Sequence, residues 1–379
     1  MSSKQNHKII KIAIAALAAL ALGVGAPVVA NHTSNQIFAA SAPYDTNEMR
    51  SFVRNTLAQN KVRGTVVVIK DGHAQQISYG YGYYGRRLGA GNTKVVYPVC
   101  SLQKVITGAI ITQLISEGKF NQDTKISRWY PNLKNADKIT VGNLLTHTSG
   151  LLATRTEVNR GINYSEGDAI NWVVNRINQL QEGNPGNFYY SNTNYILLAG
   201  IIRQVTNQSY EANVKSRIIN KLGLKRTFFY PDIPTSKTDA ISYTWRNKNY
   251  QNAQYVKRSL ASQLPGAGSL FSTPMDYYRI QVALTDGRIL TKDQFNYLTH
   301  LQSRVTSYSG GVYLKNNDNL KMAYGNLYGT HFGNWFQMTT DNQNGLIMFL
   351  NQTQNNEDRN KAIGYQILNH IKANTFTEK

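Results

Sequence analysis

The chain has 379 residues, of which 41% are hydrophobic and only 16% charged, and its formal net charge at pH 7 is +20. This length provides a sizeable core for one large or two modest domains. A single cysteine, Cys100, excludes a disulfide framework, a lipid-modified N-terminal cysteine and a cysteine-based structural zinc site. The seven histidines include no His-Glu-x-x-His motif, and we expect neither a metal nor a cofactor.

The N-terminus has the pattern of an export signal. Lys4, Lys8 and Lys11 precede an uncharged apolar run over 12–30, and small residues near Ala30 and Ala42 would suit a cleavage site. We therefore expect residues 1–30 to be a signal peptide or a retained N-terminal membrane anchor, with a linker over 31–42. Either alternative predicts a protein at the outer face of the membrane, in the cell wall, or secreted.

The charge remains strongly positive without this segment. Residues 1–42 contain three lysines and no acid, so removing them leaves 38 basic and 21 acidic residues, a net charge of +17. A cationic extracellular protein attracts polyanions. Cell-wall phosphate polymers or anionic lipid headgroups fit an exported protein better than nucleic acid, and plain solubility is the alternative.

The predicted elements follow in chain order. A capping box at Asp45–Glu48 opens a helix to about Asn60, and a hairpin turns at Asp71-Gly72. Helical patterns dominate from 101 to about 300, and two strands follow around 341–345. A last helix carries Ile363, Ile367 and Ile371 on one face. The chain thus predicts an α+β domain over 43–379: an antiparallel sheet with flanking helices from 43–100 and 305–379, and a mostly helical insertion over 101–304.

The segment Pro98–Ala109, PVCSLQKVITGA, carries the first chemical signal. Ser101 and Lys104 lie one turn apart at the start of an apolar helix that stops at Gly118. Free N–H groups and the positive end of the helix dipole favour negative charge that develops there. A second Ser-x-x-Lys pattern begins at Ser116, but that serine lies at a helix end, where the dipole opposes a nucleophile. Position therefore selects Ser101.

A serine nucleophile needs a base, and no Gly-x-Ser-x-Gly elbow is present. The pattern Tyr190-Ser-Asn192 follows a Pro-Gly break and leads directly into an apolar helix. Such a corner between a loop and a helix can hold a tyrosine hydroxyl rigidly over a cleft. His147 and Ser149 of the THTSG loop are expected to have structural roles, as is Cys100.

Five motifs in order resemble the penicillin-binding protein and class C β-lactamase family: Ser101-x-x-Lys104, LLTHTSGL, Tyr190-Ser-Asn192, GAGSLFSTP and His331-Phe-Gly333. The resemblance covers 43–375 and implies a β-lactamase/DD-peptidase-like fold and an acyl-enzyme mechanism. It implies that Ser101 is the nucleophile, Lys104 a proton acceptor, Tyr190 the base and later acid, and Asn192 the residue that orients substrate and lysine. Whether Lys104 or Tyr190 takes the serine proton stays open, because the two groups titrate together.

The third motif departs from the family's usual Lys-Thr-Gly. His331 and Phe332 stand where the family has a lysine and a threonine that receive a substrate carboxylate, Gly333 follows, and the resemblance assigns the second oxyanion N–H to Asn334. Imidazole is mostly neutral at pH 7 and phenylalanine has no hydroxyl. This composition favours a substrate without a carboxylate near the scissile bond.

Within the family, the motifs HFGNWF, GAGSLFSTPMDY and SLQKVITGAIITQL are similar to those of teichoic-acid D-alanyl esterases of Gram-positive surfaces (FmtA-like proteins). The resemblance implies a D-alanyl ester of (lipo)teichoic acid as substrate. Two alternatives remain open: a D-alanyl-D-alanine carboxypeptidase acting on peptidoglycan stem peptides, and a wall-binding protein without catalysis.

Overall fold

A computed structural model describes residues 46–83, 86–87, 94–154, 158–180, 185–234, 239–354 and 356–371. The predicted export segment over 1–30 and the linker over 31–42 lie outside these residues. Within the described ranges, no helix is both long and apolar enough to cross a bilayer.

The main sheet is assembled from both ends of the chain, as predicted. Its path runs β10-β11-β12-β13-β14-β1-β2, and every neighbouring pair along it is antiparallel. The path comprises β1 Arg63–Lys70, β2 His73–Tyr79, β10 Tyr308–Ser309, β11 Val312–Lys315, β12 Leu320–Gly325, β13 Gly333–Thr339 and β14 Gly345–Thr353. The first strand therefore pairs with the last one, which closes the domain across a long sequence separation.

The turn between β1 and β2 follows directly from its two residues. Asp71 and Gly72 both have positive φ, 50° and 78°, which fits the primed turn that joins twisted strands. Lys70 pairs with His73 across it, so the predicted hairpin is confirmed in position and register.

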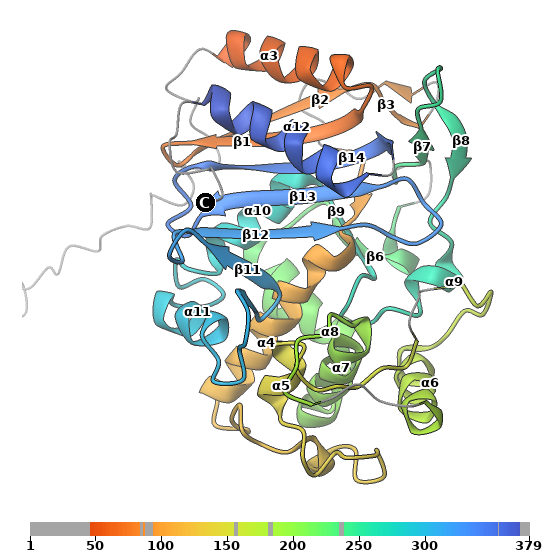
Figure 1. The fold of residues 1–379 in the computed structure, drawn as a ribbon, viewed down its shortest axis with the longest axis vertical. Helices are drawn as coiled ribbons and strands as arrows, with labels where there is room; N and C mark the ends of the chain where they lie inside the picture. The colour runs from red at the N-terminus through yellow and green to blue at the C-terminus, as the bar shows by residue number, and fades with distance from the viewer. Residues whose placement is uncertain are drawn as a thin grey trace, which may run out of the picture. The chain divides into compact units, whose positions relative to one another are not determined.

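Two helices contact each other and cover one face of the sheet (Figure 1). These are α3 Thr46–Gln59 and α12 Glu357–His370, and their apolar sides form one buried cluster with Val66, Val68 and Trp335. Ile363 and Ile367 face this core, as their spacing predicts, and Ile371 is buried just beyond the helix end. The opposite face contacts α10 Pro274–Ala283.

The region over 101–304 is mostly helical, but it also contributes strands that the sequence pattern did not predict. The sheet strand β7 Ser242–Thr244 joins the main sheet beside β14, and β6 Thr227–Phe229 pairs with β9 Leu270–Ser272. The remaining elements are η1 Cys100–Gln103, α4 Lys104–Ser116, η2 Ile126–Arg128, α5 Val141–Leu145, α6 Glu166–Gln179, α7 Asn192–Thr206, α8 Tyr210–Val214, η3 Lys215–Asn220, η4 Tyr230–Asp232, α9 Arg258–Ala261, α11 Lys292–Thr299, β3 Tyr81–Tyr83, β4 Arg86–Arg87, β5 Tyr97–Pro98 and β8 Gln251–Gln254.

Candidate active site

Ser101 lies on a sharp turn between the strand β5 and the helix α4. Cys100, the residue before it, has φ +56°, which is uncommon outside glycine and marks a tightly constrained backbone. The Cys100 side chain is buried, and its Sγ donates to the carbonyl oxygen of Pro98 at 3.4 Å. Ser101 itself is half-buried within η1. The cysteine is therefore a packed support residue, and the turn presents the serine at the start of α4.

The Lys104 ammonium is fully buried and lies beside the serine. Its Nζ donates to Ser101 Oγ at 3.0 Å, to the carbonyl oxygen of Ala267 at 3.2 Å, and to Asn192 Oδ1. Three oxygen acceptors compensate for the loss of hydration at this buried amine. The contact with Ser101 Oγ gives a proton-transfer path between the two groups predicted from the sequence.

Tyr190 and Asn192 reach Lys104 from the start of α7. Ser191 caps this helix through a hydrogen bond from the Thr193 N–H to its side chain, which fixes the corner on which both neighbours lie. The Lys104 Nζ lies 4.9 Å from the centroid of the Tyr190 ring, and the tyrosine is 37% exposed. The structure thus brings Ser101, Lys104, Tyr190 and Asn192 together from two helices.

A cluster of aromatic rings backs Tyr190. His147 lies 4.3 Å from it between ring centroids, and Tyr195 and Tyr308 also pack against the imidazole, at 5.2 and 4.8 Å. Burial raises the pKa of both tyrosines well above its ordinary value, so neither is a ready proton acceptor. Among these phenols, Tyr190 is the one that combines solvent exposure with contact to Lys104.

His147 has a structural environment rather than that of a base paired with Ser101. Burial, and then the charge on Lys104, lower the pKa of His147 well below its usual range, so the ring is neutral. Its Nδ1 accepts hydrogen bonds from Asn194 Nδ2 at 2.8 Å and from the Ser191 N–H at 3.3 Å. A neutral ring that accepts at Nδ1 carries its proton on Nε2. The imidazole therefore ties the THTSG loop to the corner that carries Tyr190.

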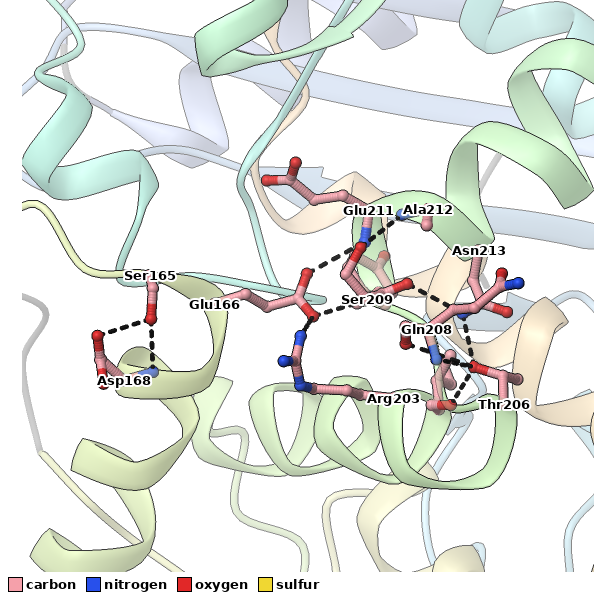
Figure 2. A network of polar contacts seen from close by, with 12 residues as sticks. Ser165, Glu166, Asp168, Arg203, Thr206, Gln208, Ser209, Glu211, Ala212 and Asn213 are labelled. Carbon is pink, nitrogen blue, oxygen red and sulfur yellow. Dashed lines mark hydrogen bonds and ion pairs between the residues drawn. The ribbon is translucent and has the colours of Figure 1, made fainter.

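A second polar network supports the residue before Lys104. The side chain of Gln103 donates to Tyr210 Oη at 3.1 Å and accepts from the Leu270 N–H at 2.7 Å. Tyr210 is the first residue of α8, and its N–H donates to Glu166 at 2.7 Å. Figure 2 shows this carboxylate between Arg203 and the start of α8. This hydrogen-bond network fixes the position of η1, and Glu166 has a structural role in it.

The strand beside the nucleophile is β12, and this corrects the predicted third motif. A Cβ built at Gly325, the last residue of β12, would lie 2.9 Å from Ser101 N, so only glycine allows this close approach. A Cβ at Gly333 would instead meet Asn360 Nδ2 of α12 at 2.5 Å. Gly333 thus faces away from Ser101, and Ala323-Tyr324-Gly325 occupies the place that the sequence motif assigned to His331-Phe332-Gly333.

The residues of the predicted motif have other contacts. His331 forms hydrogen bonds with Asn252 and Ser242 of β8 and β7, and Phe332 is buried at 3% exposure. Asn334 pairs with Gly325 on one side and with Phe349 on the other, so its backbone lies inside the sheet. Its Nδ2 donates to the carbonyl oxygen of Pro98 at 2.6 Å. Asn334 therefore supports the turn before Ser101, and its N–H is a poor candidate for an oxyanion donor.

Sequence reasoning missed Gly325 because His331-Phe332-Gly333 gave the stronger match to the family's third motif. No local signal separates the two motifs; once β12 lies beside Ser101, alternation puts residues 321, 323 and 325 on one face of the strand. Tyr324 points the other way, where its hydroxyl accepts from Asn360 Nδ2 at 3.4 Å. The end of β12 beside the nucleophile thus carries Ala323 and Gly325 on this face, which have neither a charge nor a hydroxyl. Lys321, farther along the same face, is buried and its Nζ donates to the carbonyl oxygen of Gln281 at 2.9 Å.

Two cavities lie at opposite ends of this helical region. One, of about 200 Å³, is lined by Tyr190 and Asn192 and continues past Tyr189 to Arg160 and Trp172. The larger one, of about 790 Å³, lies at the far end of α4 and includes Ser116 and Lys119. That second Ser-x-x-Lys pattern has its serine on a helix end, as predicted, and Gln294 Nε2 donates to its hydroxyl at 3.0 Å.

Comparison with known proteins places this geometry in a family. The model of the family described as Beta-lactamase matches residues 49–369. The chain is 28% identical over 321 residues to a protein of Staphylococcus aureus named teichoic acid D-alanine hydrolase, which covers 83% of this chain and 77% of that protein. The corresponding protein of strain MRSA252 is 27% identical over the same length.

Solved structures agree on the fold. The crystal structure of FmtA from Staphylococcus aureus matches with a TM-score of 0.71 and 24% identity, covering 88% of this chain and 90% of that one. D-amino acid amidase from Ochrobactrum anthropi matches with a TM-score of 0.70 and 19% identity, covering 86% of this chain and 99% of that one. The α+β fold predicted from the sequence is confirmed, and the chain belongs to the Beta-lactamase family of serine hydrolases.

Proposed function

We propose that this protein is an extracellular D-alanyl esterase of (lipo)teichoic acid. The observation that carries the proposal is the surface of β12 beside Ser101, where Ala323 and Gly325 offer no cation or hydroxyl for a substrate carboxylate. A poorly paired carboxylate there would be penalised by several kcal/mol, whereas an ester has no such charge. The similarity to teichoic acid D-alanine hydrolases over most of the chain supports the same substrate class.

In the proposed mechanism, Ser101 Oγ attacks the ester carbonyl and its proton passes to Lys104 or Tyr190. The oxygen of the tetrahedral intermediate is held by the N–H of Ser101 and, since Gly325 lies against that N–H, by the N–H of Asn326. Tyr190 then gives a proton to the polyol alcohol as it leaves. Water hydrolyses the D-alanyl enzyme and releases D-alanine. Asn192 orients the substrate while it accepts a hydrogen bond from Lys104.

We further propose that residues 1–30 direct export as a signal peptide or membrane anchor, and that 43–379 form the hydrolase domain. The net charge of +17 over 43–379 suits an anionic cell-wall polymer as partner. The enzyme would then act at the outer face of the membrane, in the cell wall, or in the medium.

The direct test is D-alanine release. The mature protein is incubated with D-alanylated lipoteichoic acid and, separately, with a pentapeptide ending in D-Ala-D-Ala. Faster release from the polymer is expected, and Ser101→Ala should abolish it. Preferential release from the pentapeptide would instead establish the carboxypeptidase alternative. If a folded protein released D-alanine from neither substrate, the alternative of a wall-binding protein without catalysis would be supported.

A further inference from the structure

The cavity of about 200 Å³ beside Tyr190 and Asn192 contains an arginine that the proposed mechanism does not use. Of the described residues lining this cavity, Arg160 is the only charged one. The others are apolar, aromatic or neutral polar, and they include Trp172, Tyr189 and Gln263. A single cation in a pocket that opens toward the reacting groups is a feature that attracts an anionic part of a substrate.

The backbone of Arg160 is held firmly in place. Gln263 is buried at 3% exposure, its Oε1 accepts from the Arg160 N–H at 2.7 Å, and its Nε2 donates to the carbonyl oxygen of Val158 at 3.2 Å. The Tyr164 N–H donates to Ser262 at 3.1 Å. This segment is therefore fixed against the loop that precedes Ala267, whose carbonyl oxygen binds Lys104.

The guanidinium is also oriented. Its Cζ lies 3.5 Å from the centroid of the Trp172 ring, and its Nε donates to Tyr164 Oη at 3.1 Å. Stacking and one hydrogen bond fix the plane of the group, which reduces the entropy lost when a ligand binds.

The outer nitrogens of Arg160 differ from those of two other arginines of this region. Among the residues that the structure describes, neither Nη1 nor Nη2 has a hydrogen-bond acceptor, and Nη2 is buried. By contrast, Arg203 pairs with Glu166 and Arg217 pairs with Glu117. Arg160 is thus a cation without a carboxylate partner among the described residues, and its Nη1 is the donor left for an oxygen of an anionic ligand.

We propose that Arg160 binds a phosphodiester of the polyol-phosphate chain next to the D-alanyl ester. This inference rests on the proposed function, and it adds the polymer backbone to what the enzyme recognises. Trp172 stacks against the guanidinium, and Tyr189, which is 51% exposed, lines the same cavity as Arg160 and Tyr190. The enzyme would then prefer esters within a phosphate chain over isolated D-alanyl esters.

The test compares two substrates on the full mature enzyme. We measure kcat/KM for D-alanylated lipoteichoic acid and for D-alanine methyl ester, which lacks phosphate. The Arg160→Gln variant should lower the ratio of kcat/KM for the polymer to kcat/KM for the methyl ester by about tenfold or more. This is the range expected for the loss of a hydrogen bond to a charged group. Arg160→Lys, which keeps the charge but loses the planar group that stacks on Trp172, should give an intermediate ratio. Arg176→Gln on the exposed side of α6 is the matched control and should keep the wild-type ratio.

A second measurement does not depend on the variants folding. Unalanylated poly(glycerol phosphate) should inhibit methyl ester hydrolysis by the wild type, and glycerol should not. An unchanged ratio in folded Arg160→Gln, or equal inhibition by both additives, would overturn the subsite. If Arg160→Gln selectively lost activity on a peptide ending in D-Ala-D-Ala, the phosphate subsite would also be overturned, since the anion bound by Arg160 would then be a carboxylate. Hydrolysis of neither ester by the wild type would contradict the proposed function itself.

Discussion

Two fully buried lysines of this protein, Lys104 and Lys321, lie in different surroundings. Lys104 donates to three oxygens, one of them the hydroxyl of Ser101, and two aromatic rings lie nearby. Lys321 on β12 donates to the Gln281 carbonyl oxygen at 2.9 Å and lies 5.3 Å from the Phe295 ring centroid. Burial lowers the pKa of Lys321 to about 7. Burial alone therefore does not make a lysine part of a reaction; a neighbouring nucleophile and a path to substrate do.

The largest effect is expected at Lys104. Lys104→Met keeps the volume and removes the amine that is hydrogen-bonded to Ser101 Oγ. We expect kcat/KM for D-alanyl ester to fall by on the order of 10³-fold, within the range of positioned acid–base groups. The measurement is D-alanine release by a variant whose circular dichroism matches the wild type. A folded variant with more than a tenth of wild-type activity would remove Lys104 from the mechanism.

Tyr190→Phe should have the next largest effect. The substitution deletes one hydroxyl and keeps the ring that packs on His147. We expect a loss on the order of 10²-fold, with the pH profile of kcat altered because one of two coupled groups is gone. Tyr189→Phe is the neighbouring control. Near-native rates in Tyr190→Phe would assign proton transfer to Lys104 alone.

Gly325→Ala tests whether β12, rather than β13, lies beside the nucleophile. The added methyl would meet Ser101 N at 2.9 Å and push the turn away from its position. Because displacements of about 1 Å can cost ~10²-fold, we expect a loss between about 10-fold and 10²-fold. Gly167→Ala, where the methyl meets only Ser165 Oγ at 4.0 Å, should be silent. If the two variants were equally active, His331-Phe332-Gly333 would again be the candidate motif beside Ser101.

Lys321→Met should change stability and leave catalysis unchanged. The pKa of Lys321 is about 7 in the folded protein, whereas its ordinary value is 10.5. Between these two pH values the unfolded chain therefore binds a proton that the folded protein does not. Wild-type stability from this group therefore rises with pH from about 7 to 10, by at most on the order of 5 kcal/mol. Urea unfolding of the variant should lack that rise and give higher stability at pH 7. A pH dependence identical to the wild type would show that Lys321 does not titrate there.

Local pattern determined much of the fold. The Asp71-Gly72 turn, the spacing of Ile363 and Ile367, and the strands around Asp341–Gly345 were predictable because each depends on neighbouring residues. Ser101 and Lys104 were predictable for the same reason, since three residues of helix place them on one face. Tyr190 and Asn192 required motif order in addition, because helix packing brings them to Lys104.

Tertiary structure decided which strand meets the nucleophile. HFGNWF and AYGNLY both place a glycine near a strand end, and nothing local distinguishes them. The register of β12 with β13 pairs Gly325 with Asn334, and the alternation of side chains turns Gly333 toward α12. The approach of Arg160 to Trp172 and to the Tyr190 corner likewise depends on contacts between segments far apart in the chain. Contacts of this kind are set by packing of whole elements, which a local sequence pattern does not contain.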